Sequence, residues 1–224
     1  MTRREYIAAL LATLALQPAI RALAQDGASA AESITYRFAN DKFLVSRIEL
    51  VISDGSGQLI FERRGLAAPV SRNVRVGARA SSEVDGLLAR LDFLGSSEVY
   101  QTREDHSNLG TTTISVRKSS AEREVSFNYT ANADMAQVAS LLRGVANREI
   151  YRFDLETAAR YQPLELPKLL EAFANELRLG RITDPTEIAP LIEELADDPT
   201  VPLIGRNQAR RILDSFAKSN GTRK

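Results

Sequence analysis

The feature that most constrains this sequence is a pair of neighbouring segments in which apolar and polar side chains alternate. The segments are residues 111–117 and 123–129, joined by a short polar link. A period of two places the apolar side chains on one face of a β-strand, so the pair predicts an antiparallel hairpin with one buried face. That face should carry Ile114, Val116, Val125 and Phe127. Helical patterns at residues 84–94 and 135–145 flank the hairpin, and we expect their apolar stripes to cover it.

Four further segments predict strands by the same alternation. Residues 46–53 and 58–63 should form a hairpin around Asp54-Gly55-Ser56-Gly57, a turn in which two glycines can adopt positive φ. Residues 34–38 and 70–76 predict additional strands. The sequence therefore predicts an α+β fold, in which antiparallel hairpins form a sheet that helices cover.

The two covering helices carry start signals. Ser82-Glu83-Val84-Asp85 is typical of a capping box, so the first helix is expected to begin there and to end near Gly95. Asn132 or Ala133 should lead into the second helix, and residues 150–161 can continue it. The first helix is expected to bury a stripe made of Val84, Leu87, Leu88 and Leu91.

After Pro163 the pattern changes to helices separated by breaks. Pro167 fits the first turn of one helix and Gly180 its C-cap, while Asp184-Pro185-Thr186-Glu187 predicts the start of the next. The helix that begins at Asp184 and the last helix are together similar to a single HEAT-type repeat, and one such unit forms no solenoid, so we expect a helical appendage. The last helix, residues 201–218, should bury Ile204, Ala209, Ile212, Leu213 and Phe216. The predicted division is an α+β domain at residues 33–162, a helical segment at 163–218 and a disordered tail at 219–224.

The first 24 residues are predicted to be a signal peptide. Arg3 and Arg4 open the chain, residues 7–16 are apolar or small, and Ala22-Leu23-Ala24 suits cleavage before Gln25. The start also resembles a twin-arginine signal, so both that route and general secretion remain open. Residues 25–32 should form a flexible leader, and the mature protein is expected to be periplasmic or secreted.

Composition narrows the possible functions. The chain has 29 Lys and Arg against 29 Asp and Glu, which provides no electrostatic reason to expect a nucleic-acid partner. It has no Cys, so disulfides, thiolate metal sites and thiol nucleophiles are excluded. We expect no transmembrane segment in the mature chain, because the apolar run of the signal is too short to span a bilayer.

A single loop combines residues that could carry out chemistry. Residues 100–108 contain Glu104, Asp105 and the only His, His106. His106 could act as a general base oriented by either acid, with Ser107 or Ser119 as the nucleophile. However, adjacent residues in a loop usually point apart, whereas a triad converges from separate segments, so a solvated loop is the favoured interpretation.

Cofactor and metal motifs are not recognised. The turn at Asp54 begins like a calcium loop, but its twelfth position is Gly65 rather than an acid. Gly55-Ser56-Gly57 is predicted to lie between strands, so it lacks the helix N-terminus that a phosphate loop uses. We therefore predict no cofactor and no metal.

The predicted order of elements resembles that of a group of exported bacterial proteins. The resemblance covers residues 34–145 and includes Leu91-Asp92-Phe93-Leu94-Gly95, Tyr100 and Leu109-Gly110-Thr111. Those proteins carry an α+β domain of unknown function, so the resemblance implies no activity and no site residues.

The leading hypothesis is a non-enzymatic binding or structural protein of the cell envelope, with an unidentified protein or envelope component as its partner. The alternative is a small hydrolase or metal-assisted enzyme that uses Glu104, Asp105 and His106. A third possibility is that the helix at residues 201–218 offers a docking surface.

Overall fold

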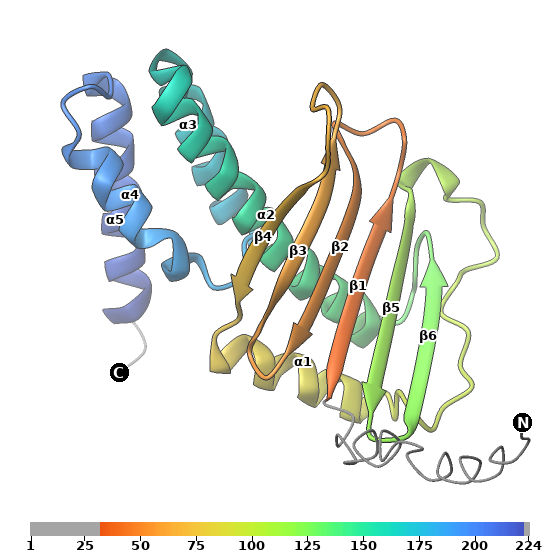
Figure 1. Cartoon of the computed structure of the whole chain (residues 1–224). Helices are drawn as coiled ribbons and strands as arrows, with labels where there is room; N and C mark the ends of the chain where they lie inside the picture. The colour runs from red at the N-terminus through yellow and green to blue at the C-terminus, as the bar shows by residue number, and fades with distance from the viewer. Residues whose placement is uncertain (1–31, 222–224) are drawn as a thin grey trace, which may run out of the picture.

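The computed structural model describes residues 32–221, with side chains through residue 218, and shows a sheet, two covering helices and a helical extension (Figure 1). The predicted signal peptide and residues 25–31 of the predicted leader lie outside the described residues. The α+β class predicted from the alternating segments is confirmed.

The sheet has six antiparallel strands in the order β4-β3-β2-β1-β5-β6. Strand β1 is central, because it pairs with β2 on one side and with β5 on the other. Both predicted hairpins are present, and the first strand joins them into one sheet. The strands are β1 (Ser33–Ala39), β2 (Val45–Ser53), β3 (Ser56–Arg63), β4 (Val70–Arg75), β5 (Thr111–Lys118) and β6 (Ala121–Phe127).

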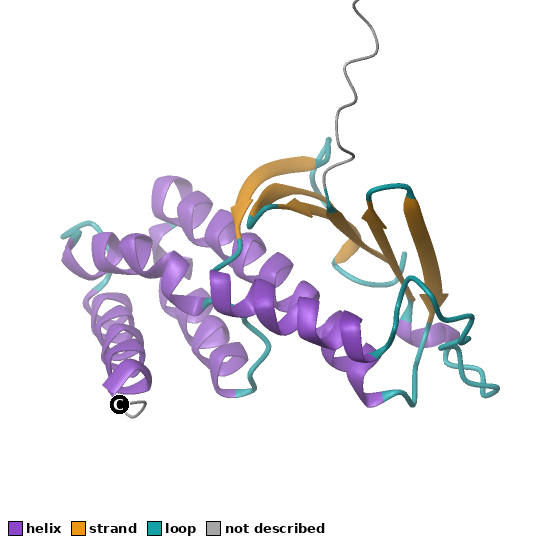
Figure 2. Cartoon of the chain, turned by 90° about the horizontal axis from the view of Figure 1, so that it is seen from below, coloured by secondary structure: helices purple, strands orange, loops and turns teal. Residues whose placement is uncertain are grey.

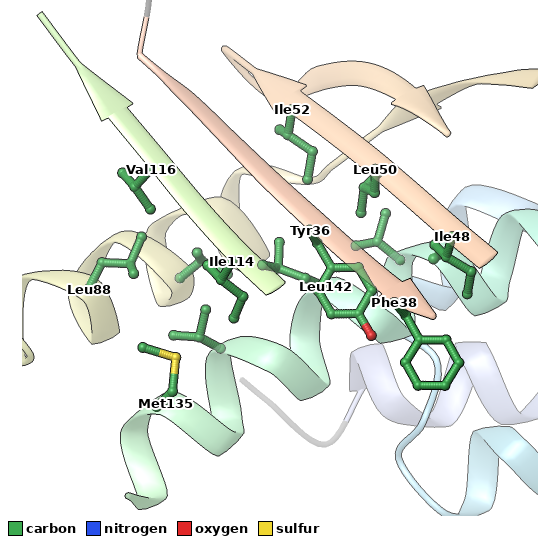
Figure 3. Packing of buried hydrophobic residues seen from close by; sticks show 14 of the residues in the cluster. Tyr36, Phe38, Ile48, Leu50, Ile52, Leu88, Ile114, Val116, Met135 and Leu142 are labelled. Atoms are coloured by element: carbon green, nitrogen blue, oxygen red, sulfur yellow. The ribbon is translucent and has the colours of Figure 1, made fainter. Parts of the chain in front are cut away.

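A row of inward side chains crosses the sheet and forms the centre of the first core. Tyr36 is the register partner of Ile114 in β5 and of Leu50 in β2, and Leu50 is in turn the partner of Leu59. None of these four side chains is more than 2% exposed. Figure 3 shows Tyr36, Leu50 and Ile114 packed towards the helices. Val116 and Phe127 are also buried and Val125 packs against the same cluster, which confirms the predicted face.

Helix α1 (Ala78–Arg90) and helix α2 (Ala133–Tyr161) lie against that face of the sheet (Figure 2). The stripe of α1 is buried as predicted, but the capping box at Ser82 is wrong because the helix already begins at Ala78. Its N-cap is Gly77, whose N–H donates to Asp184 Oδ2 at 2.8 Å. The start of this helix is therefore set in contact with a residue that is distant in the sequence, so the local sequence could not predict it.

Helix α2 is one continuous helix of 29 residues. It begins as predicted, with Asn132 Oδ1 accepting a hydrogen bond from Met135 N at 3.0 Å. Residues 150–161 continue it without a break, so a single rod reaches beyond the sheet.

The turn between β2 and β3 is tighter than predicted. Ser53 pairs directly with Ser56, which leaves Asp54 and Gly55 as the loop, with φ values of 49° and 71°. Both central residues have positive φ, as in the type I′ turn that suits the twist of a hairpin. Of the two glycines expected to have positive φ, only Gly55 does; Gly57 lies within β3.

Beyond α2 the chain forms 3₁₀ turns and three helices that share a second hydrophobic core. This core also includes Leu155 and Ala158 from the second half of α2. Helix α3 ends as predicted at Gly180, whose φ is 68°, and Arg181 N donates to Glu176 O at 3.0 Å. The elements are η2 (Pro163–Glu165), α3 (Leu166–Arg178), η3 (Pro185–Ile188), α4 (Ala189–Asp197) and α5 (Leu203–Gly221).

Three details of this helical segment differ from expectation. Asp184 precedes a 3₁₀ turn and makes no side-chain cap there, because its carboxylate is turned to Gly77. Ile204 is 67% exposed rather than buried, whereas Ala209, Ile212 and Phe216 are buried. Helix α5 also continues to Gly221, which makes residues 219–221 of the predicted tail helical. Across the described chain, every helix is too short or too polar to traverse a bilayer.

Candidate functional site

The predicted catalytic residues lie in the loop before β5, and His106 contacts two other residues there. Its Nε2 atom is 3.4 Å from Glu104 Oε2, and its ring centroid is 4.7 Å from that of Tyr129. The Glu104 side chain is 85% exposed, so solvent screens this pair. Among the described residues Asp105 forms no hydrogen bond with His106; its Oδ1 instead accepts one from Ser107 N at 2.9 Å. That bond holds the pKa of Asp105 below its ordinary value.

The proposed nucleophiles do not converge on His106. Ser107 is exposed and its backbone is tied to Asp105. Ser119 follows β5, and the length of that strand places it about 25 Å from the loop that precedes it. The enzyme hypothesis based on Glu104, Asp105 and His106 stays a prediction without a converging set of residues to support it. Within residues 32–221, no group of three or more His, Cys, Asp or Glu side chains could hold a metal ion.

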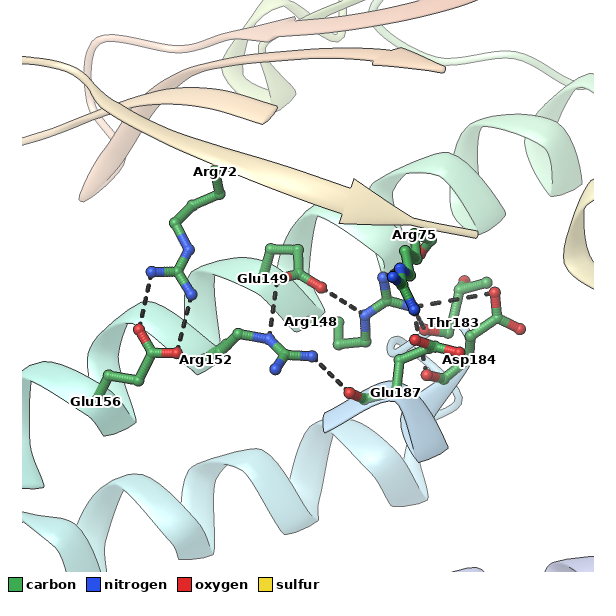
Figure 4. A network of polar contacts seen from close by, with 9 residues as sticks. All are labelled: Arg72, Arg75, Arg148, Glu149, Arg152, Glu156, Thr183, Asp184 and Glu187. Atoms are coloured by element: carbon green, nitrogen blue, oxygen red, sulfur yellow. Dashed lines mark hydrogen bonds and ion pairs between the residues drawn. The ribbon is translucent and has the colours of Figure 1, made fainter. Parts of the chain in front are cut away.

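A polar network that sequence reasoning missed lies where α2 leaves the sheet. We call it the polar junction; it joins β4, α2 and the segment around η3 (Figure 4). Its members are Arg72, Arg75, Arg148, Glu149, Arg152, Glu156, Thr183, Asp184 and Glu187. The signal in the sequence is a run of charged residues in the middle of the helix, Arg148-Glu149 followed by Arg152 and Glu156.

Arg148 is the centre of the polar junction and is fully buried. Its guanidinium donates to Arg75 O at 2.5 Å, to Thr183 O at 3.2 Å and to Asp184 O at 3.3 Å. Its Nε donates to Glu149 Oε1 at 2.9 Å, which pairs the buried charge with an acid. One side chain therefore links the edge of the sheet to the helical segment.

The other cations of the polar junction are largely matched by acids and carbonyls. Arg72 forms a two-pronged pair with Glu156, at 2.8 and 2.9 Å. Arg152 pairs with Glu149 at 3.0 Å and donates to the Glu187 carbonyl at 2.5 Å. A hollow of about 780 Å³ adjoins these groups. Because Arg72, Arg148 and Arg152 are already paired, the arrangement is suited to fixing the helical segment rather than to binding a charged ligand.

An apolar groove with a few polar side chains on its walls lies between α3 and α5. We call it the α3–α5 groove; it encloses about 560 Å³. Pro185 closes part of it, and the polar side chains on its walls are Glu171, Arg178, Gln208, Arg211 and Ser215. Its apolar walls are made by Leu170, Ala174, Leu177, Pro185, Ile212 and Phe216.

The groove exists because α5 packs its stripe on the neighbouring helices rather than on the sheet. Ala209, Ile212 and Phe216 belong to the second core with Leu170 of α3. Gln208 adds an unusual feature: its Oε1 atom is covered and has no hydrogen-bond partner in the described chain. Leaving such an oxygen unpaired costs about 1–3 kcal/mol, which a polar group of a ligand could offset. The helix predicted to offer a docking surface, α5, is thus one wall of this groove. Helix α3 forms the other wall, and the sequence does not reveal that the two helices pack side by side.

Comparisons with known proteins show a partial similarity only. No protein-family model matches the chain. Diacetyl reductases, described as (S)-acetoin forming, from two strains of Staphylococcus epidermidis are 32% identical to it over 87 residues. The aligned part is 37% of this chain and 34% of each reductase, so the chain spans about a third of the length of the curated relatives it matches.

Proposed function

We propose that this chain is an exported, non-enzymatic binding protein of the bacterial cell envelope that holds a small amphipathic molecule in the α3–α5 groove. The export part rests on the sequence of the first 24 residues, with paired arginines, an apolar run and a small-residue cleavage motif. The binding part rests on one observation, the apolar groove of about 560 Å³ with polar side chains on its walls. Sites for small molecules usually enclose about 300–1,000 Å³ and combine apolar walls with a few polar groups.

The dimensions of the groove favour a small molecule over a partner helix. The groove residues of α3 run from Leu170 to Arg178, which corresponds to about 12 Å along the helix axis. A helix with its side chains is about 10–12 Å wide, so two turns of it would need roughly twice the enclosed volume. An extended chain or a flat ring fits better.

The remaining elements act as a scaffold in this proposal. Helix α2 contributes to both cores, and Arg148 ties β4 to the segment that contains Pro185. A site on rigid helices keeps its shape without a ligand, which lowers the cost of binding.

The partial similarity to diacetyl reductases does not lead us to propose a reductase. At the β4–α1 connection, the Asp184 carboxylate accepts the Gly77 N–H, and so occupies the place where a helix N-terminus would receive an anionic ligand. Gly55 and Gly57 lie at a hairpin between antiparallel strands and not before a helix.

Binding of Nile red, an uncharged apolar dye, to the full chain tests the proposal. We expect saturable binding at one site per chain. Ala174→Trp places an indole in the groove and should weaken binding at least tenfold. The matched control is Ala136→Trp on the exposed side of α2, which should leave binding unchanged. Equal binding by both folded variants, checked by circular dichroism, would show that the groove is not the site.

A further inference from the structure

We infer that the occupant of the α3–α5 groove is a single-chain amphiphile with an anionic head, such as a fatty acid. This inference rests on the proposed function, because it specifies the ligand of the same site. It follows from the charges on the groove walls, the relative direction of α3 and α5, and the unpaired side-chain oxygen of Gln208.

Two uncompensated cations line the groove. Arg211 is exposed, and none of the described residues forms an ion pair or hydrogen bond with its guanidinium. Arg178 donates only to Asn175 Oδ1, at 2.9 Å, and that acceptor is neutral. Glu171 is the single acid on the groove walls. The excess of positive charge favours a ligand that carries a negative charge.

The charges are distributed along the groove rather than mixed. Helices α3 and α5 start beside each other, since a Cβ added at Gly205 would lie 3.5 Å from Pro167. Counting along both helices from that end, Glu171 comes first and Arg178 comes about two turns later, with Arg211 between them on the other wall. This order places an anionic head towards Arg178 and Arg211, and the apolar tail towards Leu170.

Gln208 provides a second polar contact. Its covered side-chain oxygen has no partner among residues 32–218. A half-turn of the amide presents its NH₂ group instead, which can donate to an anionic oxygen. Gln208 is one helical turn before Arg211 and level with Leu170, so its amide can reach the head from the tail side of Arg211.

The test compares the binding of three ligands that share a twelve-carbon tail and differ in the charge of the head: dodecanoate (anionic), dodecanol (neutral) and dodecyltrimethylammonium (cationic). Each is used below its critical micelle concentration. Isothermal titration of the full chain should give the tightest binding for dodecanoate and the weakest for the cation. Arg178→Gln and Arg211→Gln should each weaken dodecanoate binding about three- to fivefold, as expected for solvent-exposed charges. Binding of dodecanol should stay the same.

Glu171→Gln provides a test of opposite sign, because removing the acid should strengthen dodecanoate binding about two- to threefold. Lys168→Gln is the matched control: Lys168 is exposed on α3 and is not part of the groove lining, so its loss should change nothing.

The outcomes separate this inference from the proposed function. Equal affinity for dodecanoate and dodecanol, or tighter binding of the cation, would overturn the anionic head while leaving the groove as a binding site. Failure of all three amphiphiles and of Nile red to bind would overturn the proposed function itself.

Discussion

At the scale of single residues, Arg148 shows how one buried charge can hold two parts of a chain together. Its acceptors are carbonyl oxygens of Arg75, Thr183 and Asp184, which come from β4 and from the segment before η3. Its charge is matched by Glu149, the next residue on α2. Backbone carbonyls have no sequence signature, so the environment of Arg148 could not be predicted from the residues around it.

We predict that Arg148→Met lowers the free energy of unfolding by about 3–5 kcal/mol, measured by urea denaturation. The methionine fills similar space but leaves three carbonyl acceptors without their donor, and the buried Glu149 carboxylate keeps only its pair with Arg152. Arg160→Met, on the exposed part of the same helix, should change stability by less than about 0.5 kcal/mol. A loss equal to that of the control would mean that the polar junction does not hold the helical segment.

At the scale of elements, periodicity located the strands and helices, while their ends depended on distant contacts. The alternation at residues 111–117 identified β5, and Ile114 and Val116 are buried as it predicts, although Ser115 between them is buried as well. The start of α1 was misplaced by four residues, since Asp184 contacts Gly77 from more than a hundred positions away. The groove was missed for the same reason, because it needs the packing of α3 beside α5.

Two glycines in different elements should respond to alanine in opposite ways. In β3, a Cβ at Gly57 would lie 1.9 Å from Val51 O of the neighbouring strand, so Gly57→Ala should cost about 1–3 kcal/mol. In α1, a Cβ at Gly86 would meet nothing within 4 Å, so Gly86→Ala should stabilise by about 0.5–1 kcal/mol. Thermal melting of both variants checks the prediction. A gain in stability for Gly57→Ala would contradict the close approach of the two strands.

At the scale of the whole molecule, the sequence indicated a change of architecture at Pro163, and the structure shows how the two parts are joined. Helix α2 places Met135 through Ile150 in the first core and Leu155 with Ala158 in the second. Periodicity predicted the apolar positions of this helix but not which core each one enters, because that depends on how far the helix extends past the sheet.

Because both cores share one continuous helix, we predict that they unfold together. Unwinding the second half of α2 would expose Leu155, which is fully buried, and would separate Arg148 from Thr183 and Asp184. Calorimetry of the full chain should therefore show one transition, whose measured enthalpy equals its van't Hoff enthalpy. Near the midpoint of thermal unfolding, the amide hydrogens of β1 and of α5 should exchange with solvent at the same rate. Two separate heat-absorption peaks, with α5 losing protection first, would instead show that the helical segment folds as an independent unit that α2 merely connects.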